Sequence, residues 1–169
     1  MSWEQFKQQA PQLAETAESL FEKSGVILLG TIRRDGSPRI SPVEPIILDG
    51  QLYLGMMWHS FKALDLLRDP RCTVHSSVAD RLAPDGEFKL HGRAIDVQDQ
   101  KIRSRYGKAL YEKIGWNPEE SGDTEEASPK YHLFSIDIFS AAFLNTEGDA
   151  RKVLRWRLGE SVEEFIQTA

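Results

Sequence analysis

The sequence predicts a mainly β (α+β) fold, a small antiparallel barrel of six strands with peripheral helices. Asp-Gly pairs at residues 35–36 and 49–50 each separate two β-type runs, which is typical of tight hairpins. Further strand-like runs follow at residues 72–78, 87–97 and 132–144. Helical patterns are few, and they fall between or outside these runs.

Residues 2–21 carry apolar side chains at alternating steps of three and four, which is a helical stripe. Ser2 and Gln5 can form a capping box at its start, and Pro11 interrupts it. We therefore expect two short helices, or one kinked helix, that cover one end of the sheet.

The next three runs, residues 26–32, 39–48 and 51–57, are joined by the two Asp-Gly turns. Consecutive hairpins predict a three-stranded antiparallel meander. In the later strand at residues 87–97, Gly92 is expected to mark a bulge or a bend.

A short helix is expected over residues 60–68, with Ser60 as its N-cap and Asp69-Pro70 as its stop. Its inward side chains are expected to be Ala63, Leu64 and Leu67.

Two further helices are expected. Asp99 is predicted to cap a helix that stops at Gly115. The tail from residue 149 is expected to be helical, whereas the acidic residues between Glu119 and Glu126 are expected to form a solvated loop.

Composition excludes several classes of protein. A net charge of −5 argues against a general nucleic-acid binder, because such a surface repels phosphate backbones. No apolar run approaches the ~18 residues that a membrane span needs, and the N-terminus has no basic and apolar signal regions. The single cysteine, Cys72, excludes an internal disulfide. We therefore expect a single cytoplasmic domain with neither nucleic acid nor membrane as its partner.

Groups suited to a phosphate monoester gather in two neighbouring segments. Ser60 stands where a helix begins, and Lys62 lies in its first turn, where a cation opposes the helix dipole. This placement indicates either a bound anion or a solvent-facing lysine. Arg39 begins the strand that the Asp49-Gly50 hairpin connects to the strand leading into Ser60, so the two halves can be adjacent. A solvent-facing Arg39 remains the alternative.

No other motif carries recognisable chemistry. None of the four histidines shows a zinc-like pair spacing, and with one cysteine no metal site is expected. The chain has no nucleophile elbow, P-loop or dinucleotide glycine fingerprint, which disfavours acyl transfer, nucleotide hydrolysis and NAD binding. No side chain is assigned a catalytic role.

The order of these segments resembles the pyridoxamine 5′-phosphate oxidase-like flavoproteins, which are FMN-binding split β-barrels. The resemblance covers residues 24–144 and is sharpest at residues 29–43, 52–55 and 60–70. It implies one FMN-binding split-barrel domain over residues 1–169, a homodimer with FMN at the subunit interface, and an oxidoreductase acting on a small planar substrate. The cofactor-binding residues that it implies are Arg39, Ile40, Ser41, Gly55, Met56, Ser60, Lys62 and, reaching the ring from the partner subunit, Glu87.

Departures from the family pattern affect the substrate half of the site most, while the cofactor half is largely kept. Glu44 stands near the position of a lysine that binds substrate phosphate in the oxidase, and Leu110 follows Tyr106 where the oxidase contacts its substrate. Phe61 replaces one of a basic pair, and Leu144 replaces a flavin-stacking tryptophan. A true pyridoxamine phosphate oxidase is therefore not expected. An F420-dependent reductase, or a non-catalytic flavin or haem binder on the same barrel, remains the alternative.

Overall fold

The computed structural model describes residues 1–116, 118, 131–147 and 150–168. The helices are α1 (Trp3–Gln9), α2 (Pro11–Ser24), α3 (Phe61–Arg68) and α4 (Gln100–Ile114). The strands are β1 (Ile27–Ile32), β2 (Pro38–Val43), β3 (Pro45–Leu48), β4 (Gln51–Met57), β5 (Arg71–Ser76), β6 (Glu87–Asp96), β7 (Tyr131–Glu147), β8 (Ala150–Arg157) and β9 (Glu163–Thr168). The predicted acidic loop lies outside the described residues.

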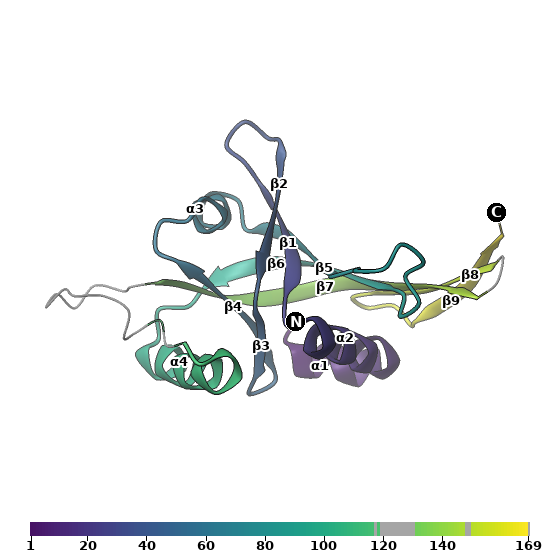
Figure 1. Cartoon of the computed structure of the whole chain (residues 1–169), viewed down its shortest axis with the longest axis horizontal. Coiled ribbons are helices and arrows are strands. Elements are labelled where there is room, and N and C mark those ends of the chain that lie inside the picture. The colour runs from purple at the N-terminus through teal and green to yellow at the C-terminus, as the bar shows by residue number, and fades with distance from the viewer. Residues whose placement is uncertain (117, 119–130, 148–149, 169) are drawn as a thin grey trace, which may run out of the picture.

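The described strands form one antiparallel sheet with the order β2-β1-β5-β6-β7-β4-β3, to which β8 and β9 are added beside β7. The sheet curls, but no ladder joins β2 to β3 within the described chain, so the barrel stays open (Figure 1). This arrangement confirms the predicted mainly β split barrel with peripheral helices. None of the helices in the described ranges has an apolar stretch of membrane-spanning length.

The described sheet has nine strands rather than six, and one reason is a break at Glu44. Residues 39–48 were expected to form one strand, but Glu44 lies between Pro42 and Pro45, and Pro45 has no N–H for a ladder. As a result β2 pairs with β1, and β3 pairs with β4. Both predicted hairpins are confirmed, whereas the continuous three-stranded meander is wrong.

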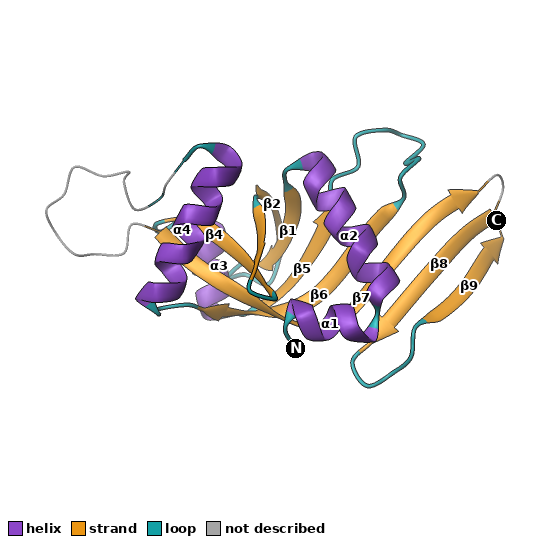
Figure 2. Ribbon diagram, turned by 90° about the horizontal axis from the view of Figure 1, so that it is seen from below, coloured by secondary structure: helices purple, strands orange, loops and turns teal. Residues whose placement is uncertain are grey.

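The other reason is the C-terminal tail, which forms β8 and β9 rather than the expected helix. Leu154 and Trp156 of β8 are buried and alternate with arginines, which is a strand period. Arg155 pairs across the hairpin with Glu163 at 2.5 Å, and Lys152 pairs with Glu164 at 3.0 Å. Together with the far end of β7, this hairpin extends away from α3 and α4 (Figures 1 and 2).

The N-terminal helices cover one face of the sheet (Figure 2). The capping box of Ser2 and Gln5 is present, and Pro11 begins α2 as a separate helix, as predicted. Phe6 is fully buried, and its ring centroid lies 5.4 Å from that of Trp3 and 5.1 Å from that of Trp156. The first helix therefore packs against the added strand β8.

A second, smaller core lies under α4, where Tyr106 and Leu110 pack against β3, β4 and β7. The Asp99 side chain caps the helix, and Gly115 ends it in the left-handed region, as predicted. The predicted irregularity at Gly92 is also confirmed, because the register between β6 and β7 shifts between His91 and Gly92.

Candidate functional site

The predicted phosphate-binding segments meet along a seam between β2 and α3. The Arg39 Nε donates a hydrogen bond to the Asp65 carboxylate at 2.7 Å, and the Lys62 Nζ donates one to the Pro42 carbonyl at 2.6 Å. Each contact joins β2 to α3. Residues 39 and 42 are about 10 Å apart along an extended strand, so Arg39 and Lys62 lie at two points of the seam.

Ser60 occupies the N-cap position of α3, as predicted, but its side chain does not cap the helix. Its Oγ is buried and has no hydrogen-bond partner among the described residues. A buried hydroxyl without a partner costs free energy, and the first N–H groups of a helix attract anions. The start of α3 therefore offers donors that an anion could satisfy.

Lys62 lies within reach of this helix terminus and is half-buried. Burial lowers the pKa of Lys62, while the Glu44 carboxylate acts in the opposite direction. An ammonium group that is partly withdrawn from water interacts more strongly with a nearby anion than an exposed one does.

Asp65 is a site residue that the sequence analysis missed. It is 4% exposed and accepts hydrogen bonds from Arg39 and from the Thr31 hydroxyl, the latter at 3.0 Å. Burial raises the pKa of Asp65, but these hydrogen bonds outweigh it and hold the pKa below its ordinary value. The carboxylate thus fixes the Arg39 guanidinium, whose carbon also lies 5.2 Å from the centroid of the Phe61 ring.

The contacts of Asp65 also explain why α3 turns a different face to the sheet from the one predicted. Ala63 is buried as predicted, but Leu64 and Leu67 are exposed, whereas Asp65 and Leu66 are buried. The helix turns its carboxylate toward Thr31 and Arg39. No residue next to Asp65 in the sequence indicates this inward orientation, because Thr31 and Arg39 lie in earlier segments of the chain.

The other predicted cofactor residues lie on β2, β4 and β6. Ser41 is half-buried, and Ile40 is exposed on β2. Gly55 and Met56 lie on β4, where a Cβ on Gly55 would overlap the Tyr106 hydroxyl. Glu87 begins β6, and Lys89 donates a hydrogen bond to it at 2.6 Å. The contacts described for Glu87 include no residue of the seam, so its role across an interface stays a prediction.

Two cavities flank the seam. One, of about 880 Å³, is lined by Arg39 together with Arg33, Arg34, Phe61 and Arg68. The other, of about 550 Å³, lies between β4 and α4, which sit beside each other in Figure 1. Its lining includes three predicted residues, Gly55, Met56 and Lys62. The predicted site residues are therefore divided, with Arg39 on one side of α3 and Lys62 on the other.

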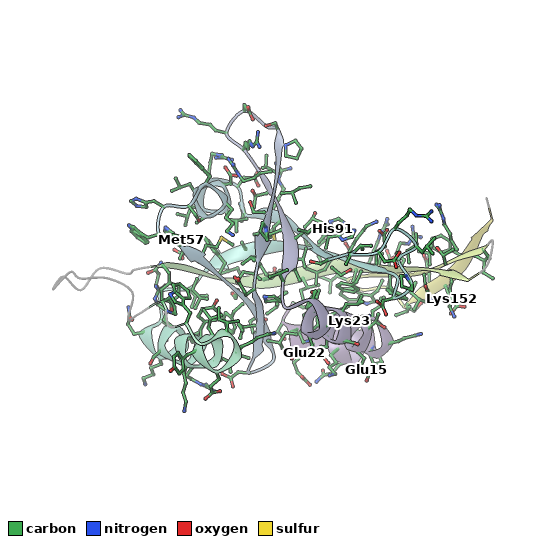
Figure 3. All side chains as sticks on the ribbon, in the orientation of Figure 1. Glu15, Glu22, Lys23, Met57, His91 and Lys152 are labelled. Atoms are coloured by element: carbon green, nitrogen blue, oxygen red, sulfur yellow. The ribbon has the colours of Figure 1, made fainter. Side chains whose placement is uncertain are left out.

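Beyond β4, aromatic rings stack at the turn that leads into α3. The Trp58 and His132 ring centroids are 4.2 Å apart with the ring planes at 11°, and His59 stacks on Trp58 at 4.7 Å. Burial lowers the pKa of His132, so its ring is favoured in the neutral form. Met57, just before this turn, projects to the surface (Figure 3).

Solved structures with the same fold come from several bacteria. PhzG from Burkholderia lata 383, in complex with tetrahydrophenazine-1-carboxylic acid, is 13% identical, with a TM-score of 0.66 over 99% of this chain and 93% of that chain. A pyridoxamine 5′-phosphate oxidase-related, FMN binding protein from Nostoc punctiforme PCC 73102 is 16% identical, with a TM-score of 0.61 over 95% and 96%. General Stress Protein 26 from Bacillus anthracis str. Sterne is 17% identical, with a TM-score of 0.58 over 85% and 96%. At these identities the likeness shows the fold.

A comparison with curated proteins gives no match. The sequence profile of the family described as pyridoxamine 5′-phosphate oxidase matches residues 13–145, which is most of the chain and includes both sides of the seam. The chain therefore belongs to the pyridoxamine 5′-phosphate oxidase family.

Proposed function

We propose that this chain is an FMN-binding oxidoreductase acting on a small planar substrate, with the flavin phosphate at the start of α3. The observation that carries the proposal is the buried Ser60 hydroxyl, which has no partner in the described chain, next to the half-buried Lys62. Family membership supports the same cofactor, as does the Nostoc punctiforme structure, whose name states that it binds FMN.

The residues present fit a phosphate monoester. Three kinds of donor are present: the Ser60 hydroxyl, the Lys62 ammonium and the free N–H groups of the first turn of α3. The positive charge strengthens hydrogen bonds from the ammonium, and the helix dipole strengthens those from the N–H groups. Ile40 and Ser41 of β2 and the backbone of Gly55 and Met56 are then available along the ribityl chain and ring. Bound flavin would supply the hydride or electron transfer, while the chain binds and orients it.

A homodimer that places two flavin sites at its interface is part of the proposal. Ile40, Met57 and Phe61 are 71%, 74% and 72% exposed, and they belong to β2, β4 and α3 around the seam. Large apolar side chains gathered on a surface are typical of interaction sites. A second copy on this face would cover them, and its Glu87 would then be the ring contact. In this proposal, residues 1–169 form one FMN-binding domain of each subunit. A cytoplasmic location stays a prediction.

The experiment is an FMN titration of purified protein, followed by flavin fluorescence. Ser60→Ala should weaken FMN binding about 5- to 15-fold, since an ordinary hydrogen bond is worth about 1–1.5 kcal/mol. Lys108→Met, on the exposed face of α4, is the control and should leave the affinity unchanged. Protein that binds haem or F420 but not FMN, or a Ser60→Ala variant with unchanged affinity, would contradict the proposal.

A further inference from the structure

The turn between β4 and α3 sets the position of Ser60, and its backbone is strained. The Ser60 N–H donates a hydrogen bond to the Met57 carbonyl at 3.0 Å, which closes a four-residue turn around Trp58 and His59. His59 has a φ of 56°, in the left-handed region that costs free energy for a residue with a Cβ. A backbone in this region persists where contacts around it stabilise it.

A stack of aromatic rings supplies these contacts. The His59 ring centroid lies 4.7 Å from that of Trp58, and the Trp58 ring lies on that of His132, 4.2 Å away with the ring planes at 11°. His132 in turn stacks on Phe134, with centroids 6.2 Å apart. Both of these residues belong to β7 and are buried. The stack therefore fixes the turn to the interior of the sheet.

His132 contributes its ring to this stack rather than a hydrogen bond from its buried nitrogen. Its Nε2 has no hydrogen-bond partner in the described chain, which costs free energy. Phenylalanine has a flat ring without such a nitrogen. It should therefore replace His132 in the stack, whereas alanine should not.

The position of Ser60 decides which donors the start of α3 presents. Its carbonyl accepts the first hydrogen bond of the helix, from the Leu64 N–H at 3.0 Å. Its hydroxyl does not cap the helix and has no partner among the described residues, so no contact of the hydroxyl itself fixes its direction. That direction depends on the turn, and through the turn on the stack. Donors that are already in position bind an anion without a further cost of ordering.

We propose that Trp58 and His132 are positioning residues for the flavin phosphate, because their stack fixes the turn that presents the Ser60 hydroxyl and the first N–H groups of α3. The identity of the anion rests on the proposed function. The effect of the stack on the turn requires no flavin.

The first measurement is amide hydrogen exchange of Ser60 and Leu64 in flavin-free protein, followed by NMR. The hydrogen bonds of these two amides close the turn and begin the helix. His132→Ala and Trp58→Ala should each speed exchange about 3- to 10-fold, the size expected for the loss of one aromatic pair. His132→Phe should keep the wild-type rates.

The second measurement is the affinity of the same variants for FMN and for riboflavin, which lacks the phosphate. His132→Ala and Trp58→Ala should weaken FMN binding about 3- to 10-fold and change riboflavin binding by less than about 2-fold. His132→Phe should keep the wild-type preference for FMN. Phe165→Ala is the matched control, because this ring on β9 is as exposed as that of Trp58, and it should change neither affinity.

Unchanged amide exchange or unchanged FMN affinity in the alanine variants would overturn the inference. An equal loss for both flavins would also overturn it, since the rings would then contact the flavin ring instead of positioning the phosphate site. Trp58 is 43% exposed, so Trp58→Ala decides the question even if His132→Ala does not fold.

The wild type separates the two proposals. Equal binding of FMN and riboflavin by the wild type refutes the proposed phosphate site and the positioning role with it. A wild type that prefers FMN, together with alanine variants that keep this preference, refutes the positioning role alone.

Discussion

Asp65→Asn removes the charge that fixes Arg39 while keeping the size of the side chain. The buried carboxylate accepts hydrogen bonds from Arg39 at 2.7 Å and from Thr31 at 3.0 Å. Hydrogen bonds to a charged group contribute about 1.5–3 kcal/mol, and the amide oxygen can still accept from Thr31. Because 22% of the Arg39 side chain is exposed, water relieves part of the loss. We therefore expect the free energy of unfolding to fall by about 1.5–2 kcal/mol, or roughly 3–8 °C in Tm for a chain of this size.

The assay is urea denaturation at pH 7, 5 and 3, followed by tryptophan fluorescence. The pKa of Asp65 in the folded state is lowered, so its stabilisation is complete above the unfolded pKa of about 3.9 and is lost as pH falls through the folded pKa. The difference between wild type and variant should be the same at pH 7 and pH 5 and smaller at pH 3. Glu160→Gln, at an exposed position, is the control. A difference below about 0.5 kcal/mol at pH 7, or one that does not shrink at pH 3, would refute this account of Asp65.

Three further predictions concern packing and reactivity. Phe6→Ala should cost about 3–5 kcal/mol in urea denaturation, because the ring is fully buried between Trp3 and Trp156, and a loss below 1 kcal/mol would contradict that packing. Gly55→Ala should lower the stability by about 1–3 kcal/mol, since the new methyl group overlaps the Tyr106 hydroxyl; an unchanged Tm in calorimetry would show that β4 and α4 are less closely packed. Burial raises the pKa of the Cys72 thiol to about 12, so a disulfide reagent at neutral pH should modify it only after unfolding, and rapid reaction of the native protein would count against its burial.

The features that sequence analysis predicted correctly are fixed by neighbouring residues. The hairpin at Asp49-Gly50 forms because both residues adopt positive φ, at 51° and 71°, and this requirement is visible in the residue types. The caps of α4 at Asp99 and Gly115 depend on the same local chemistry. The strand break at Glu44 was missed, although Pro42 and Pro45 lie on either side of it. Strand-forming residues before and after the break led to the prediction of one continuous strand.

The features that it missed depend on distant residues. The tail forms strands because β8 pairs with β7 and because Trp156 packs on Phe6, about 150 positions earlier in the chain. In the site, the segments with Arg39, Ser60 and Lys62 do lie on neighbouring elements, but not by the predicted route: the Asp49-Gly50 hairpin joins β3 to β4, and β2 reaches α3 through the contacts of Arg39 and Lys62. The role of Asp65 was not predictable in the same way, since a carboxylate turns inward only when its partners, here Thr31 and Arg39, lie on strands of other segments.

The central claim is that the start of α3 holds the phosphate of the flavin, and a comparison of FMN with riboflavin tests it most directly. Riboflavin has the same ring and ribityl chain but no phosphate. Dissociation constants for both, measured with wild type and Lys62→Met, form a cycle that isolates the contact between Lys62 and the phosphate. We predict that Lys62→Met weakens FMN binding at least 10-fold and leaves riboflavin binding unchanged, since a charged hydrogen bond is worth about 1.5–3 kcal/mol. An equal loss for both flavins, or no loss for either, would contradict the claim.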